Sequence, residues 1–323
     1  TVTGTPTQGQ TLTASNSIAD ADGPGAITYH WLRGGVDTGA TGTTYVLAEA
    51  DVGATIAARA TYTDAHGTNE SVTSSATAAV ANVNDAPAGV PTISGTATEN
   101  QVLSASTAGI SDADGLGAFS YQWLRNGVAI GGATTSTYTL GNADVGAQMS
   151  VQVAYTDAHG TAEGPLTSAQ TAAVANVNDA PSGSVTVTGT PTQGQTLTAS
   201  NSIADADGLG AITYHWLRGG VDTGATGTTY VLAEADVGAT IAARATYTDA
   251  HGTNESVTSS ATAAVANVND APAGVPTISG TATENQVLSA STAGISDADG
   301  LGAFSYQWLR NGVAIGGATT STY

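Results

Sequence analysis

The stretch FSYQWLR, residues 119–125, alternates large apolar and polar side chains with a period of two. Phe119, Tyr121 and Trp123 fall on one face, and polar side chains fall between them. Such alternation is typical of a β-strand with one buried face. We therefore expect a strand here whose aromatic face, with Trp123 on it, lies against a core.

The same period recurs on both sides of this stretch. In QMSVQVAY, residues 148–155, the inward face is predicted to carry Met149, Val151, Val153 and Tyr155. The matching inward set earlier in the chain is Ile56, Ala58, Ala60 and Tyr62. Glycine-rich breaks separate the expected strands as turns. About seven short strands in each stretch of this length predict a two-sheet sandwich.

The chain is built from repeats of this unit. Residues 1–138 and 186–323 differ at one position, where Pro24 becomes Leu209. Within this long period of about 185 residues, the four tryptophans recur roughly every 92 residues. The predicted domains are type A repeats at 1–87 and 182–272 and type B repeats at 88–181 and, incomplete, at 273–323. Because the last repeat stops just past its middle, we expect both termini to be cuts from a longer array.

Composition narrows the class of protein. The chain carries 26 acidic residues, no lysine, six arginines and a formal net charge of −20. This charge excludes nucleic acid as a partner and disfavours anionic membranes. No apolar run reaches the roughly 18 residues of a membrane span, and no signal peptide is present. Without cysteine there is no disulfide framework. This composition fits a secreted or surface-exposed bacterial protein.

Histidines and nucleophile motifs give no sign of an enzyme. His30 and His215 stand beside tryptophans in the type A repeats, but Gln122 and Gln307 replace them in type B. A group that glutamine replaces within the same chain is a poor candidate for catalysis. No phosphate loop, nucleophile elbow or H-E-x-x-H motif occurs. Three further histidines lie in TDAHG motifs at His66, His159 and His251. Asp-x-His is a weak metal-ligand pattern, and we prefer the interpretation of these histidines as polar turn residues.

The region after Trp123 carries a resemblance. YTLGNADVGAQMSVQVAYTDAHG, residues 138–160, resembles the immunoglobulin-like pattern of a leucine, an Asp-x-Gly and an alternating strand. As a whole, the units resemble tandem Ig-like and cadherin-like repeats of giant bacterial surface adhesins, many of them RTX proteins exported by type I secretion. No RTX nonapeptide occurs in the chain. The resemblance implies an all-β tandem array of Ig-like/cadherin-like β-sandwich domains that forms an extended rod.

The motif ANVNDAP ends one repeat and opens the next at 81–87, 175–181 and 266–272. NVNDAP is similar to the cadherin linker D-x-N-D-N-x-P, which shares calcium with acids of the flanking domains. A DADG motif follows each linker, and the TEN of type B resembles the cadherin N-terminal glutamate. The resemblance implies these calcium ligands: Asn84, Asp85, Glu99, Asp112, Asp114, Asn178, Asp179, Asp205, Asp207, Asn269, Asp270, Glu284, Asp297 and Asp299.

Calcium needs six to eight oxygen ligands at about 2.3–2.6 Å, more than one such loop supplies. Asx-Gly clusters also form turns without any metal, so a purely structural role remains an alternative. Alignment of the repeats sets Glu99 and Glu284 against Gln8 and Gln193. On that basis we expect glutamates at the joints 81–114 and 266–299, and weaker calcium binding at 175–207.

These features predict a structural role: the stalk of a long extracellular adhesin or surface fibre, with domain joints stiffened by calcium (Ca2+). Its partners would be neighbouring repeats of the same chain and, in a fibre, other copies. Two alternatives remain. The repeats could bind in cell–cell or polysaccharide attachment, or they could be fibre subunits that exchange strands. Aromatic residues make up only 5% of the chain and fall mostly at expected core positions, which disfavours a binding surface.

Overall fold

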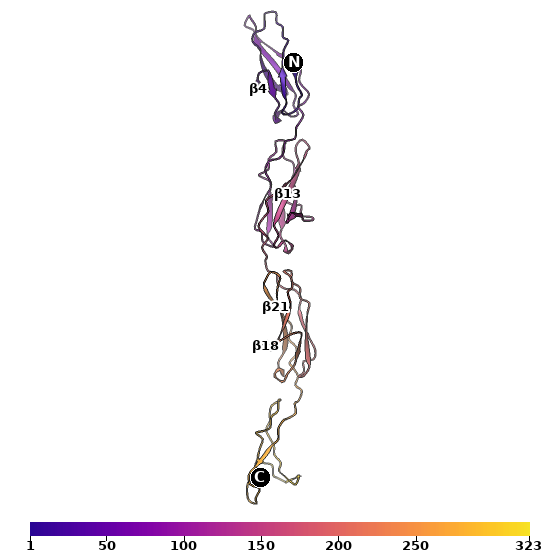
Figure 1. Cartoon of the computed structure of the whole chain (residues 1–323), viewed down its shortest axis with the longest axis vertical. Coiled ribbons are helices and arrows are strands. Elements are labelled where there is room, and N and C mark those ends of the chain that lie inside the picture. Colours follow the sequence, from indigo (N-terminus) through magenta and orange to yellow (C-terminus); the bar gives the residue numbers. More distant parts are fainter. The chain divides into compact units, whose positions relative to one another are not determined.

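The computed structural model describes residues 1–323, and its regular secondary structure is almost entirely short antiparallel strands (Figure 1). It divides into two compact units, residues 1–177 and 178–323. The only helical elements are three single 3-10 turns. No helix has the length and hydrophobicity needed to cross a lipid bilayer. The all-β prediction is confirmed.

The first repeat forms a sandwich of a three-stranded sheet, β1-β2-β5, and a four-stranded sheet, β4-β3-β6-β7. Trp31 of β3 is fully buried between the sheets and stacks on Tyr45, with ring centroids 5.3 Å apart. The elements are β1 Val2–Thr3, β2 Thr11–Ala14, β3 Thr28–Arg33, β4 Val36–Thr41, β5 Thr44–Val46, the 3-10 turn η1 Glu49–Asp51, β6 Ile56–Thr63 and β7 Asn69–Thr73.

The second repeat has the same two sheets, ordered β8-β9-β12 and β11-β10-β13-β14. Trp123 pairs with Val151 across β10 and β13 and is fully buried, as its alternating stretch predicted. The predicted inward residues of the second stretch are buried as well. The elements are β8 Thr92–Ser94, β9 Val102–Ser106, β10 Ser120–Arg125, β11 Val128–Ala129, β12 Thr137–Thr139, η2 Asn142–Asp144, β13 Met149–Thr156 and β14 Ala162–Thr167.

The third repeat, in the second unit, repeats this order as β15-β16-β19 and β18-β17-β20-β21. Its elements are β15 Val185–Thr188, β16 Thr196–Asn201, β17 Thr213–Arg218, β18 Val221–Thr226, β19 Thr229–Val231, η3 Glu234–Asp236, β20 Ile241–Thr248 and β21 Asn254–Thr258. The remaining residues form two two-stranded sheets from β22 Thr277–Ser279, β23 Ser289–Ser291, β24 Leu309–Arg310 and β25 Val313–Ala314.

One buried aspartate fixes the turn that precedes the long strand of each complete repeat. In the first repeat this is Asp51, which is fully buried in η1. Its carboxylate accepts hydrogen bonds from Arg33 Nε at 2.6 Å, from the Tyr45 hydroxyl at 2.9 Å and from the Ala48 N–H at 2.8 Å. This network explains the Asp-x-Gly element of the resemblance, and it fixes Glu49 at the start of the same turn.

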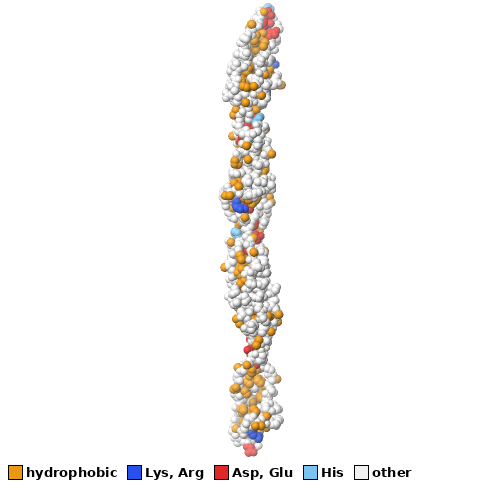
Figure 2. Space-filling model, turned by 90° about the vertical axis from the view of Figure 1, so that its right-hand side faces the viewer, with side chains coloured by type: hydrophobic (Ala, Val, Ile, Leu, Met, Phe, Trp, Pro, Cys, Tyr) orange, Lys and Arg blue, Asp and Glu red, His pale blue; other side chains and the backbone are white.

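The outer surface carries few basic groups. On the face drawn in Figure 2, hydrophobic side chains are spread along the chain, and Lys or Arg side chains show at only a few points. Exposed valines such as Val36, Val128 and Val221 are each about seven-tenths exposed. Single apolar residues of this kind are normal on protein surfaces.

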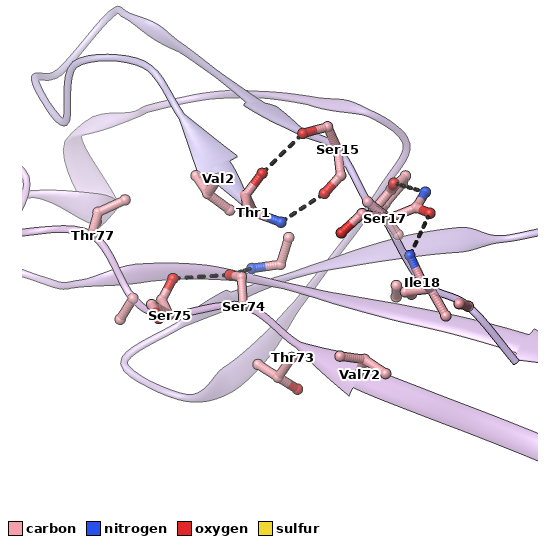
Figure 3. Close-up of a pocket in the computed structure, with 16 residues that line it drawn as sticks. Thr1, Val2, Ser15, Ser17, Ile18, Val72, Thr73, Ser74, Ser75 and Thr77 are labelled. Carbon is pink, nitrogen blue, oxygen red and sulfur yellow. Dashed lines mark hydrogen bonds between the residues drawn. The ribbon is translucent and has the colours of Figure 1, made fainter.

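A groove opens along one flank of the first repeat (Figure 3). It has a volume of about 600 Å³, and its lining includes Val2, Ile18, Tyr29, Ala58 and Val72. Its walls come from both sheets, so it reaches the core between them.

In the third repeat, Val185 at the start of β15 lies in the corresponding part of the core. It is 4% exposed and packs in one cluster with Ile203, Tyr214 and Ala243. These three residues correspond to Ile18, Tyr29 and Ala58 of the first repeat, by the 185-residue period. The first residue of β15 therefore closes this flank of the sandwich.

Candidate functional site at the repeat joints

The linker at 81–87 is tied to the repeat that it leaves. Thr7 forms a parallel bridge with Ala81. The Gln8 side chain then holds the next part of the linker: its Oε1 accepts the Val83 N–H at 3.0 Å, and its Nε2 donates to Asp85 Oδ2 at 2.9 Å. Gln8 thus belongs to the joint on the outgoing side of its own repeat.

The same linker is tied to the repeat that it enters. The Asp85 N–H donates to Asp114 Oδ2 at 2.6 Å. Asn84 Nδ2 donates to Glu163 Oε1 at 2.8 Å, and Ala88 pairs with Ser111 just beyond. A short segment hydrogen-bonded to both neighbours does not behave as a free tether. The joint at 81–114 is therefore a defined piece of structure within the first unit.

The two carboxylates of the DADG loop at 112–115 differ in their hydrogen bonding: both oxygens of Asp112 have partners, whereas one oxygen of Asp114 has none. Asp112 accepts the Asp114 N–H at 2.9 Å and the Tyr155 hydroxyl. Burial, together with this hydrogen bond to Asp112, raises the pKa of Tyr155. Asp114 is 2% exposed, yet its Oδ1 has no hydrogen-bond partner. An unpaired buried carboxylate oxygen is costly, so this atom marks a position where a cation would be stabilised.

Two residues outside the predicted set complete this position. Carboxylate oxygens of Glu49 and Asp114 and a ring nitrogen of His159 lie within 4.8 Å of one another. Glu49 Oε1 is 3.4 Å from His159 Nε2, and Glu49 Oε2 is buried without a partner. Glu49 begins η1 of the first repeat, whereas His159 follows β13 of the second. The sequence interpretation of His159 as a turn residue holds for its backbone but omits this contact.

More unpaired buried oxygens belong to motifs that recur at the joints. Asn82 Oδ1, at the start of the linker, and Asp157 Oδ2, in TDAHG, are both buried without a partner. The predicted linker ligand is Asn84 instead, whose amide Nδ2 donates to Glu163 Oε1. The corresponding orphaned atoms elsewhere are Asn176 Oδ1, Asp207 Oδ1, Glu234 Oε2 and Asp249 Oδ2.

The joint at 266–299, in the second unit, repeats this design. Gln193 Nε2 donates to Asp270 Oδ2 at 2.9 Å, and the Asp270 N–H donates to Asp299 Oδ2 at 2.7 Å. Carboxylate oxygens of Glu234, Asp270 and Asp299 lie within 4.8 Å of one another. Burial and the negative charges of Asp299, Asp270 and Asp297 raise the pKa of Glu234. Carboxylates crowded in this way repel one another unless a cation lies between them.

The predicted joint of Glu99 is wrong. Glu99 is 2% exposed, its N–H donates to Ala175 O at 2.9 Å, and its Oε2 accepts the Val177 N–H at 3.2 Å. It therefore lies beside the linker that leaves its own repeat, not beside the joint at 81–114. The reason is tertiary: Thr98 pairs in parallel with Ala175, which holds this loop against the end of the repeat. The expected weakness of the joint at 175–207 loses its basis.

The two repeat types carry their outgoing carboxylate in different loops. Type A has Gln8 beside the linker and Glu49 at the start of η1. Type B has Glu99 beside the linker, and Asn142 stands at the start of η2. Between the two repeat types, the glutamate moves from one loop to the other, and a neutral amide residue, Gln8 or Asn142, stands in the loop without it. Each complete repeat consequently keeps one glutamate for its outgoing linker.

The incoming side of the third repeat matches that of the second. Asn178 Nδ2 donates to Glu255 Oε1 at 2.8 Å, and the Asp179 N–H donates to Asp207 Oδ2 at 2.6 Å. Asp205 accepts the Asp207 N–H at 2.9 Å. Asp207 is 2% exposed and, as noted, keeps one oxygen unpaired. These four predicted residues therefore lie together within the second unit.

The predicted ligands on the incoming side of the joint at 266–299 include one that is more exposed than its counterpart at 81–114. Asn269 Nδ2 donates to Asp270 O at 2.9 Å, and Asp297 Oδ1 accepts the Asp299 N–H at 3.0 Å. Asp299 is exposed, unlike Asp114. Glu284 is exposed and hydrogen-bonds to none of these residues. The structure does not bring Glu284 to the joint at 266–299.

No protein-family model and no curated protein matches the sequence. Among solved structures, the chain is similar to a Ca2+-stabilised adhesin of an Antarctic bacterium that binds ice, with 20% identity, 88% of this chain and 77% of that chain covered, and a TM-score of 0.31. A tetra-tandem repeat from the extending region of a large adhesion protein has 18% identity, covers 90% of this chain and 78% of its own, and has a TM-score of 0.28. The D1–D4 ectodomain of ICAM-5 has 16% identity, coverages of 80% and 71%, and a TM-score of 0.34. At such low identity and TM-score, the geometry of the joints is the basis for the function proposed below.

Proposed function

We propose that this chain is a stalk segment of an extracellular bacterial adhesin or fibre, in which calcium stiffens the joints between Ig-like repeats. The observation that carries the proposal is the joint at 81–114. There a linker bonded to both neighbours lies beside Asp114, whose buried oxygen has no partner. A flexible tether would need neither feature.

The counter-ion for these carboxylates has to come from solution. The chain has no lysine and only six arginines. Five of the arginines pair with aspartates inside single repeats, such as Arg33 with Asp51 and Arg59 with Asp37. The sixth, Arg310, bonds to Tyr323. No arginine of the chain is therefore bound to the joint carboxylates.

Calcium fits this demand because it takes hard oxygen ligands in flexible geometry. The joint at 81–114 offers oxygens from Glu49, Asp85, Asp114 and Asn82, together with linker carbonyls. These oxygens belong to two repeats and to the linker between them. An ion bound there would resist bending of the joint. In a tandem array each domain contacts only its neighbours, so reach grows with the number of repeats.

The test measures melting temperature and small-angle scattering of the full chain, with calcium and with a chelator. Binding to the folded joint and not to the unfolded chain should raise the melting temperature and lengthen the particle. Asp114→Asn should reduce both responses. Asp22→Asn is the matched control: it changes the same motif position in the first repeat, where the side chain is 60% exposed. If calcium changes neither quantity in the parent chain, the metal has no place in the function.

A further inference from the structure

The joint at 81–114 contains an imidazole among its oxygens, and this changes which ions it should accept. We propose that Glu49, Asp114 and His159 form a site for a borderline transition-metal dication of the zinc class, which competes there with calcium. The inference rests on the proposed function only for the premise that this joint binds a divalent cation.

The separations suit a small ion. A tetrahedral zinc site with bonds of about 2.0–2.1 Å places its ligand atoms about 3.3–3.4 Å apart. His159 Nε2 and Glu49 Oε1 are 3.4 Å apart, and the nearest Asp114 oxygen falls within the same 4.8 Å group. Three protein ligands leave the fourth position for water, as zinc sites with an open position do.

The ligand chemistry separates the two ions. Calcium is bound by oxygens, whereas zinc, copper and nickel readily take imidazole nitrogen. The His159 ring is one-third exposed, so an ion can reach it from solvent. Its loop is nonetheless held, because Asp157 Oδ1 accepts the His159 N–H at 2.8 Å. A positioned imidazole next to an unpaired, buried Asp114 oxygen is the arrangement on which the inference depends.

The chain supplies its own comparison sites. His66 lies in the same TDAHG motif of the first repeat, where its ring is 74% exposed and 3.7 Å from Asp22. No glutamate of another repeat joins that pair. At the joint 266–299 the corresponding cluster is Glu234, Asp270 and Asp299, which offers oxygens alone. Of the two clusters that lie within one unit, only the one at the joint 81–114 therefore combines carboxylates with an imidazole.

The experiment titrates the full chain with ZnCl2 by calorimetry, with and without excess CaCl2, and repeats the titration with CoCl2 to follow the visible bands of nitrogen-ligated cobalt. His159→Gln should weaken zinc binding at one site by at least about 10–100-fold, the scale seen when even an outer-shell partner of a metal ligand is lost. Its calcium response should stay unchanged. His66→Gln, the matched control, should leave zinc binding as in the parent chain. Glu49→Gln should weaken both ions.

The outcomes separate this inference from the proposed function. Zinc binding that His159→Gln does not weaken, or that His66→Gln weakens equally, overturns the inference whatever calcium does. If zinc binds through His159 while calcium changes neither melting temperature nor scattering, the inference stands and the calcium part of the proposed function fails. If calcium stiffens the chain but zinc does not bind, the proposed function stands and this inference fails.

Discussion

The first and third repeats are the same sequence in two different situations. Over their shared residues they differ only at Pro24 and Leu209, yet their ends differ. In the third repeat Asp207 is 2% exposed, whereas the equivalent Asp22 side chain is 60% exposed. The linker residue Asp179 bonds to Asp207, whereas Asp22 has no corresponding linker contact in the structure.

The flank of the sandwich shows the same contrast. Val185 closes the core of the third repeat, and the first repeat has a groove in the corresponding place (Figure 3). The centre of the two repeats is unchanged, since Trp31 and Trp216 are both fully buried. The comparison teaches that a repeat makes its own core, while the chain before it completes its incoming end. The predictions below test each half of that statement.

The largest effect should be the same in both repeats. Trp31→Ala and Trp216→Ala should each lower the free energy of unfolding of their own repeat by about 3–5 kcal/mol, because both side chains are fully buried. A domain has only about 5–15 kcal/mol in total, so calorimetry of the full chain should show one transition lost or moved far down. Clearly unequal losses would mean that the neighbours also determine the core.

The next effect should appear in the third repeat alone. Val185→Ala removes a buried side chain and should lower the stability of that repeat by about 1–3 kcal/mol. Val221→Ala is the control, because Val221 is 72% exposed. Hydrogen exchange of the peptide that spans residues 180–205 is a suitable measurement. Exchange as slow in Val185→Ala as in the parent chain would show that Val185 does not close the core.

The hydrogen-bond network around Asp236 should make the stability of the third repeat sensitive to acid, independently of the preceding linker. Burial acts to raise the pKa of Asp236, but hydrogen bonds from the Ala233 N–H, Arg218 and Tyr230 outweigh it, and the net pKa is lowered. A lowered folded pKa stabilises above the unfolded value of about 3.9, and that stabilisation is lost as pH falls through the folded pKa. Asp236→Asn should therefore flatten the fall in melting temperature below about pH 4.

The control for that network is Asp222→Asn, which breaks the half-exposed pair with Arg244. It should leave the acid profile close to that of the parent chain, because exposed ion pairs contribute little. An unchanged profile in Asp236→Asn would remove this carboxylate from the acid response. Asp51 makes the corresponding bond to Arg33 at the same 2.6 Å, so the network does not depend on the preceding linker.

The sequence predicted what depends on local pattern. The alternation around Trp123 placed a buried strand, and the alternation at Ile56–Tyr62 identified the inward residues, because side-chain direction in a strand follows directly from position. The linker motif also marked the joints, since it recurs with the repeat. These features need no knowledge of how one strand lies against another.

The joint ligands depend on such knowledge and were predicted less well. Glu99 was assigned to the wrong joint because the end of the sandwich on which its loop lies is set by the pairing of Thr98 with Ala175. Glu49 was missed because no recognised motif contains it, and only the fold brings the start of η1 beside the joint. The exchange of glutamate between the loop at Gln8 or Glu99 and the 3-10 turn at Glu49 or Asn142 can be recognised only from the structure, which places both segments beside the outgoing linker of their repeat.

The smallest expected effect is the sharpest test of the comparison. Pro24→Leu makes the first repeat identical to the third over their shared residues, and Leu209→Pro makes the reverse change. Leu209 is 45% exposed, and surface substitutions away from special features usually change stability by no more than about 0.5 kcal/mol. We therefore expect both variants to melt within about 2–4 °C of the parent chain, and the slow exchange around Val185 to persist in Leu209→Pro. If Pro24→Leu instead brought the first repeat to the stability of the third, the single sequence difference would explain the contrast. The preceding chain would then have no part in completing a repeat.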